Sequence, residues 1–133
     1  PNNFNSWISD PAFGLDPSEQ GFADDPDEDQ LPNGLEAWFG THPGEFSPGL
    51  RGFITNGTTT TFQHPQNDNP PSDLSGYYEW SLNLSDWYAN GSGPPGGPTV
   101  TFAPSTAGTT TTVTATASEP TPLLFLRVGV RQD

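Results

Sequence analysis

The chain has 133 residues, enough for one domain or for a small subdomain joined to a domain. Its 16 acidic residues face only three arginines and no lysine, and the net charge of −13 excludes a basic surface for nucleic acid or anionic membranes. There is no cysteine, so help for a modest core has to come from a metal ion, from packing or from oligomerisation rather than from disulfides. No apolar run reaches the roughly 20 residues of a membrane span.

The chain begins with a short helical pattern. Phe4, Trp7 and Ile8 recur at the spacing of one helix face, and Asn2 or Asn3 can cap the first turn. The chain starts without a methionine, as a processed form or a fragment would.

A second helical pattern follows an acidic stretch. Leu35, Trp38 and Phe39 form one face, Pro32 suits the first turn, and Gly40 suits the C-terminal cap. Neither helix is long enough to be stable alone. We expect them to pack on each other through Trp7, Ile8, Leu35 and Phe39.

Three aspartates alternate just before the second helix, and such like charges repel unless a cation neutralises them. Calcium loops of the EF-hand type draw oxygen ligands from their first, third, fifth, seventh, ninth and twelfth residues. Counted from the first aspartate, these positions hold Asp25, Asp27, Asp29, Leu31 (through its carbonyl), Asn33 and Glu36. The sequence therefore predicts a calcium site. The alternatives are a weaker site than a full sensor loop and a solvated acidic loop that caps the helix.

The sixth residue of such a loop is normally glycine, because the turn needs a positive φ. Here it is Gln30, and we expect that residue to be strained.

The stretch 25–43 resembles the aspartate-rich calcium motif of thrombospondin type 3 and dockerin-like repeats, most closely the form DPDGDGLxNLLEYALGTDP of secreted bacterial proteins. Ten positions match: Asp25, Asp27, Asp29, Leu31, Asn33, Leu35, Glu36, Gly40, Thr41 and Pro43. Glu28 and Gln30 stand in place of glycines, and His42 stands in place of an aspartate. Residues 77–87 and 124–128 resemble, more loosely, segments of the small C-terminal β domain that follows this motif. The resemblance implies secretion and a structural role.

From residue 48 onward the pattern is that of β-structure. Alternation and turn residues predict strands at 50–55, 58–63, 77–84, 99–103, 109–118 and 123–131. Asn56-Gly57 predicts a tight hairpin between the first two. The expected fold is mainly β: an antiparallel β-sandwich over 46–133, preceded by a two-helix calcium-loop subdomain over 1–45.

Two of these strands are unusual. The strand at 109–118 is almost all threonine, valine and alanine, and the last strand is apolar on both faces. Either the last strand lies in the middle of its own sheet with the threonine strand at the edge, or another molecule covers it by strand addition.

Catalytic patterns are not evident. His42 and His64 each precede proline in separate segments, and neither a zinc pattern nor a nucleophile elbow is present, so we expect no enzymatic activity. Aromatic residues suggest carbohydrate contact at Trp87 and Tyr88, although packing in the core or over a sheet edge explains the aromatic residues as well.

Three sequons, at Asn56, Asn83 and Asn90, mark glycosylation positions if a host with that machinery secretes the chain. The sequence therefore favours an extracellular or cell-surface structural module. Calcium would staple it, and copies would assemble through β edges into a surface or fibrous structure. The alternative is a carbohydrate-binding or anchoring C-terminal module of a larger secreted enzyme.

Overall fold

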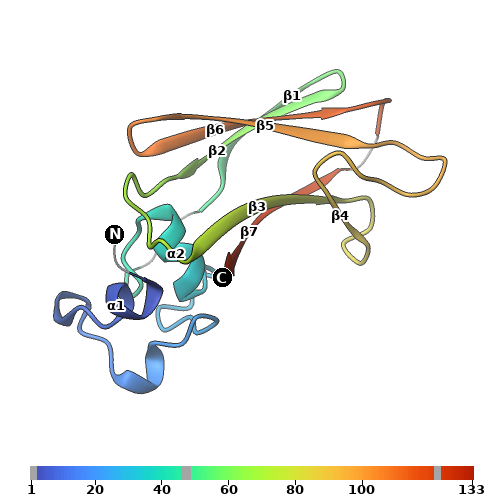
Figure 1. The fold of residues 1–133 in the computed structure, drawn as a ribbon. Coiled ribbons are helices and arrows are strands. Elements are labelled where there is room, and N and C mark those ends of the chain that lie inside the picture. Colours follow the sequence, from blue (N-terminus) through green and yellow to red (C-terminus); the bar gives the residue numbers. More distant parts are fainter. Residues whose placement is uncertain (1–2, 46–48, 122–123) are drawn as a thin grey trace.

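The computed structural model describes residues 3–45, 49–121 and 124–133. Over these ranges a helical segment comes first and seven strands follow, arranged in two antiparallel sheets (Figure 1). The predicted mainly β fold with two short N-terminal helices is confirmed. Asn2 and Leu123, which were expected at the first helix cap and at the start of the last strand, lie outside the described residues.

The larger sheet has the order β1-β2-β6-β5. Its strands are β1 (Arg51–Asn56), β2 (Thr59–Pro65), β5 (Val100–Ala107) and β6 (Thr110–Ala117). The predicted hairpin joins β1 to β2, and Gly57 takes the left-handed conformation, with φ +64°, that its turn requires.

The smaller sheet has the order β4-β3-β7. Its strands are β3 (Leu74–Ser81), β4 (Trp87–Ala89) and β7 (Phe125–Gln132). β4 was not predicted, because a three-residue strand is too short to show an alternating pattern.

The main core lies between the sheets and follows the alternation of side chains along the strands. Its buried members are Phe62, Trp80, Val100, Phe102, Val113, Ala115 and Ala117. Tyr78 packs against this cluster from the same face of β3 as Trp80. The indole N–H of Trp80 donates to the Ser92 carbonyl at 2.8 Å, so its one polar atom is satisfied.

The first of the two alternatives for the last strand, in which β7 is central and the threonine strand lies at the edge, is wrong. β6 is paired on both sides, by β2 and β5, whereas β7 is paired with β3 alone among the described strands. The small inward residues of β6 suit a central strand because the larger rings of Phe62 and Phe102 on its neighbours fill the core beside them. The alternative, in which another molecule covers β7, therefore stays open.

The helical segment holds α1 (Phe4–Ile8), two single-turn 3-10 helices, η1 (Pro11–Phe13) and η2 (Pro17–Glu19), and α2 (Asn33–Phe39). Asn3 caps α1 by accepting from the Ser6 N–H at 2.8 Å, and Gly40 ends α2 with φ +82°. Both caps were predicted.

A second buried cluster joins the helices to the smaller sheet: Phe4, Ile8, Ala37 and Leu74, with Val130 packed against it. The helices therefore meet through Ala37, not through Leu35 and Phe39 as expected. Phe39 is buried elsewhere, stacked on His64 with ring centroids 4.9 Å apart. Leu35 lines a cleft beside β7.

The C-terminal end of α2 is fixed on the loop between β2 and β3. The Asn67 side chain donates to the Ala37 carbonyl at 3.1 Å, and the Gln66 side chain donates to the Trp38 carbonyl at 2.9 Å. These bonds satisfy carbonyls that have no partner within a helix. Trp38 lies so close to Gly76 of β3 that a Cβ there would come within 2.4 Å of its ring nitrogen. α2 is thus held directly on the sheet.

Across the described residues, no helix has both the length and the apolar character needed to span a membrane.

Candidate metal centre

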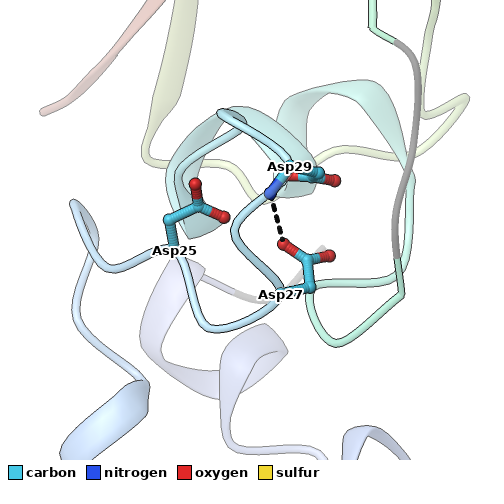
Figure 2. A group of neighbouring side chains, drawn as sticks. All are labelled: Asp25, Asp27 and Asp29. Carbon is cyan, nitrogen blue, oxygen red and sulfur yellow. Dashed lines mark hydrogen bonds between the residues drawn. The ribbon is translucent and has the colours of Figure 1, made fainter.

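The three alternating aspartates gather on the loop that leads into α2 (Figure 2). One carboxylate oxygen from each of Asp25, Asp27 and Asp29 lies within 4.8 Å of the others. Asp29 is buried, and the other two are half-buried. Three carboxylates at this separation repel one another strongly unless protons or a cation neutralise them.

Backbone hydrogen bonds fold the loop around these side chains. The Gln30 N–H donates to Asp25 Oδ2 at 2.9 Å, and the Leu31 N–H donates to Asp29 Oδ1 at 2.9 Å. The Asp29 N–H points at Asp27 Oδ1 over 3.4 Å, the contact drawn in Figure 2. Each aspartate therefore accepts from the backbone farther along the same loop, which fixes its carboxylate toward the loop interior.

The loop also requires two left-handed backbone positions. Gln30 has φ +73°, as its place in the loop predicted, and Glu28 has φ +55°. These are the two positions at which the resembling motif carries glycine. A residue with a Cβ is disfavoured there by roughly 1–2 kcal/mol. Such strain persists only where the surrounding structure enforces it.

Asn33 and Glu36 lie in the first turn of α2, directly after this loop. Both side chains are fully buried, at 0% exposure. The Asn33 amide donates to the Glu19 carbonyl at 2.7 Å and to the Gly21 carbonyl at 2.9 Å. Because both amide hydrogens are used in this way, the orientation of the amide is fixed and its Oδ1 faces away from those carbonyls.

Four side-chain oxygens of this group are buried and have no hydrogen-bond partner in the described parts of the chain: Asp25 Oδ1, Asp27 Oδ2, Asn33 Oδ1 and Glu36 Oε1. Buried acceptors are nearly always satisfied, because leaving one unpaired costs about 1–3 kcal/mol. All four belong to residues predicted as metal ligands. A hard cation accepts oxygen ligands of this kind, so the donor set fits calcium.

The electrostatics of the group point the same way. Burial raises the pKa of Asp27 to about 6, and the neighbouring carboxyl groups of Asp25 and Asp29 add to this. Burial also raises the pKa of Glu36 to about 8, and the charges of Asp29 and Asp27 add to this, whereas the Thr41 hydroxyl opposes it. Without a cation, the site therefore favours protonated carboxyl groups.

The structure thus brings together the side chains of three of the six predicted ligands, Asp25, Asp27 and Asp29, and it places Glu36 close enough for the charges of Asp29 and Asp27 to raise its pKa. The ligand roles of Asn33 and of the Leu31 carbonyl stay predictions. Sequence reasoning missed the contact between Thr41 and Glu36, in which the threonine hydroxyl donates to Glu36 Oε2 at 2.5 Å. The one sequence signal for this contact was that Thr41 matches the aspartate-rich calcium motif that residues 25–43 resemble.

The structure does not bring the two predicted carbohydrate contacts together. Trp87 and Tyr88 pair with successive residues of β3 and so point to opposite faces of the sheet. Tyr88 packs against Trp80 in the core, with ring centroids 5.1 Å apart. Trp87 lies outside, under the guanidinium of Arg127 at 3.9 Å from the ring centroid.

The three sequon asparagines differ in their surroundings. Asn56 is exposed at the end of β1. The Asn83 side chain accepts from the Ser85 and Asp86 N–H groups and so builds its own turn. Asn90 Oδ1 accepts from the Phe102 N–H at 2.9 Å. The side chains of Asn83 and Asn90 therefore take part in local structure, whereas Asn56 lies exposed at the end of its strand.

His64 is a buried residue, although it precedes proline at the start of a polar segment. Its ring is fully buried, with Nδ1 2.7 Å from the Pro65 carbonyl and Nε2 2.7 Å from the Tyr78 hydroxyl. Because a carbonyl only accepts, Nδ1 carries the proton and Nε2 accepts from Tyr78. Burial lowers the pKa of His64, which keeps the ring neutral. It is a packing residue between α2 and the sheets.

No family model matches the chain, and no curated protein or solved structure is significantly similar to it.

Proposed function

We propose that the chain is an extracellular structural module whose N-terminal segment is stapled by a calcium ion. The observation that supports this most directly is the set of four buried side-chain oxygens without hydrogen-bond partners, all on residues at ligand positions of the loop. Bound calcium would supply positive charge to the carboxylates and a partner for each of these oxygens.

The N-terminal segment needs such stabilisation because its helices are too short to be stable alone. α1 has five residues and α2 has seven, lengths at which a helix is not stable in water by itself. The chain has no cysteine to tie them down. An ion held by the loop and by Asn33 and Glu36 would fix the loop to α2, and α2 is in turn fixed on β3 through Trp38 and Gly76.

Thermal unfolding with calcium and with a chelator tests this proposal. At a free calcium concentration roughly one hundred times the dissociation constant, mass action predicts about 2.7 kcal/mol of added stability. Glu36→Gln removes one charge without changing the shape of the side chain and is expected to abolish most of the shift. Asp68→Asn, an exposed aspartate in the loop between β2 and β3, is the matched control and should retain the shift. An unchanged melting temperature in the wild-type protein would mean that the loop is merely acidic.

We further propose that the structural role is assembly between copies of the chain through the open side of the sandwich. All six residues of β1 are exposed, and its side chains Phe53 and Ile54 are 52% and 68% exposed. β1 and β7 are edge strands of the two sheets. A groove of about 280 Å³ is lined by Phe53 and Thr55 of β1, by Leu124 just before β7 and by Leu126 within β7. Exposed edges of this kind accept added strands.

Light scattering at increasing protein concentration, with calcium present, measures this assembly. Ile54→Lys is expected to reduce the particle mass, because a charge would be buried in the added interface. Thr116→Lys, exposed on the outer face of β6, is the control that should leave it unchanged. A strictly monomeric wild-type protein at high concentration would refute assembly and leave the calcium staple intact. Trp87 and Tyr88 cannot stack on one sugar together, because their side chains lie on opposite faces of the sheet.

A further inference from the structure

Thr41 is joined to the ligand residue Glu36 by its backbone and by its side chain. At the end of α2, the N–H groups of Gly40 and Thr41 donate to the Glu36 carbonyl at 2.8 and 3.0 Å. The Thr41 hydroxyl donates to Glu36 Oε2 at 2.5 Å. The left-handed turn at Gly40 therefore fixes Thr41 beside the carboxylate of a residue one turn earlier in the helix.

The two oxygens of Glu36 consequently have different surroundings. Oε2 accepts the Thr41 hydrogen, whereas Oε1 is buried and has no hydrogen-bond partner among the residues with described positions. Once Glu36 is ionised, as cation binding requires, its carboxylate only accepts, so the Thr41 hydrogen occupies one lone pair of Oε2. Oε1 keeps both of its lone pairs for a cation, and it is the oxygen that a cation can bind without competing with Thr41.

In a calcium loop of the EF-hand type, the glutamate at the twelfth position binds through both oxygens. Because Thr41 competes for Oε2, binding through both oxygens of Glu36 is disfavoured, and the predicted ligands then supply six atoms: one each from Asp25, Asp27, Asp29, the Leu31 carbonyl, Asn33 and Glu36. Magnesium requires six ligands in near-octahedral geometry, whereas calcium accepts six to eight. The second glutamate oxygen is therefore an advantage that calcium can use and magnesium cannot.

We infer that Thr41 is a positioning residue that holds Glu36 as a one-oxygen ligand and thereby limits the preference of the site for calcium over magnesium. The inference rests on the proposed calcium function, and it assigns a specificity role to a residue outside the six ligand positions. Removal of the hydroxyl leaves Glu36 Oε2 buried without a donor, and calcium can then satisfy that oxygen by binding both.

The test compares Thr41→Val, which keeps the shape and removes the hydroxyl, with Thr41→Ser, which keeps the hydroxyl. Titration calorimetry with calcium chloride and with magnesium chloride gives the ratio of the two affinities for each protein. Thr41→Val should raise the calcium-to-magnesium ratio by about tenfold or more, the amount that one hydrogen bond to a charged group represents. Thr41→Ser should leave the ratio at the wild-type value. Thr116→Val, on the exposed outer face of β6, controls for a general effect of the substitution.

If the cation-free Thr41→Val protein does not fold, melting temperatures in saturating calcium and in saturating magnesium give the same comparison, since both are measured on loaded protein. A calcium-to-magnesium ratio that is unchanged or lower in Thr41→Val overturns the inference. If neither ion raises the melting temperature of the wild-type protein, the proposed calcium function itself fails. If the wild-type protein binds calcium and Thr41→Val binds with an unchanged preference, only the role of Thr41 fails.

Discussion

Replacement of Gln30 by glycine should stabilise the calcium-free protein. Gln30 has φ +73°, and its side chain is exposed. The hydrogen bond from its backbone N–H to Asp25 Oδ2 at 2.9 Å does not depend on the side chain. Relief of the left-handed strain is worth roughly 1–2 kcal/mol, and the greater freedom of glycine in the unfolded chain removes about 0.5–1 kcal/mol. The net gain is roughly 0.5–1 kcal/mol, which for a chain of this size raises the melting temperature by roughly 2–5 °C.

Gln30→Ala is the matched control, because alanine loses the same amide group and keeps the Cβ that causes the strain. Thermal unfolding of the three proteins in chelator measures the effect. We expect Gln30→Gly to melt above the wild-type protein, and Gln30→Ala to melt at or below it. A glycine variant that is no more stable than the alanine variant would show that the left-handed conformation of Gln30 carries no strain.

The remaining predictions concern Glu36, His64 and their partners. The folded-state pKa of Glu36 is about 8, above its ordinary value of 4.5, so between these pH values the folded protein binds a proton that the unfolded chain does not. The stability of the calcium-free protein should therefore fall as pH rises from about 4.5 to 8. Denaturant titrations should show a smaller fall in Glu36→Gln. The pH dependence of stability that His64 causes has the opposite sign. Because burial lowers its pKa, its contribution to the free energy of unfolding is present above pH 6.5 and is lost as pH falls below that value. His64→Gln should remove this loss of stability in acid. Tyr78→Phe removes the donor to His64 Nε2 and should cost about 1–3 kcal/mol in the free energy of unfolding, whereas Tyr77→Phe, on the outer face of the same strand, should cost less.

The ligand loop and the helices could be predicted because their signals are local. The spacing of Asp25, Asp27 and Asp29 fixes the loop, and Asn3, Pro32 and Gly40 mark the helix ends that the structure shows. The left-handed conformation of Gln30 followed from its position in the loop even though the residue is not glycine.

The order of the strands could not be predicted from the same kind of signal. Hydrophobicity along one strand left two alternatives for the apolar β7, a central place in its sheet or cover by another molecule, and the structure has β7 at the edge of one sheet and the threonine-rich β6 inside the other. Which strand is central depends on how side chains of different strands fill one core. Here Val113 and Ala115 leave room for Phe62, Trp80 and Phe102. That complementarity is a property of contacts between residues far apart in the chain.

The burial of His64 and the contact of Thr41 with Glu36 also depend on the fold in ways that single residues do not reveal. A histidine before proline in a polar segment reads as a surface residue, and only the stacking of Phe39 and the hydroxyl of Tyr78 explain why it is buried. Thr41 lies beyond the last ligand position, and its importance depends on the turn that brings its hydroxyl to Glu36.

Calcium titration of the native chain by calorimetry tests the central claim most directly. The buried oxygens of Asp25, Asp27, Asn33 and Glu36 predict a single bound ion per chain, with release of protons at neutral pH because Glu36 holds a proton there in the calcium-free state. Repeating the titration in buffers of different ionisation enthalpy measures that release. A single site with proton release, lost in Glu36→Gln, is the result that we predict. Either the absence of binding heat, or weak binding of several ions that Glu36→Gln leaves unchanged, would contradict it.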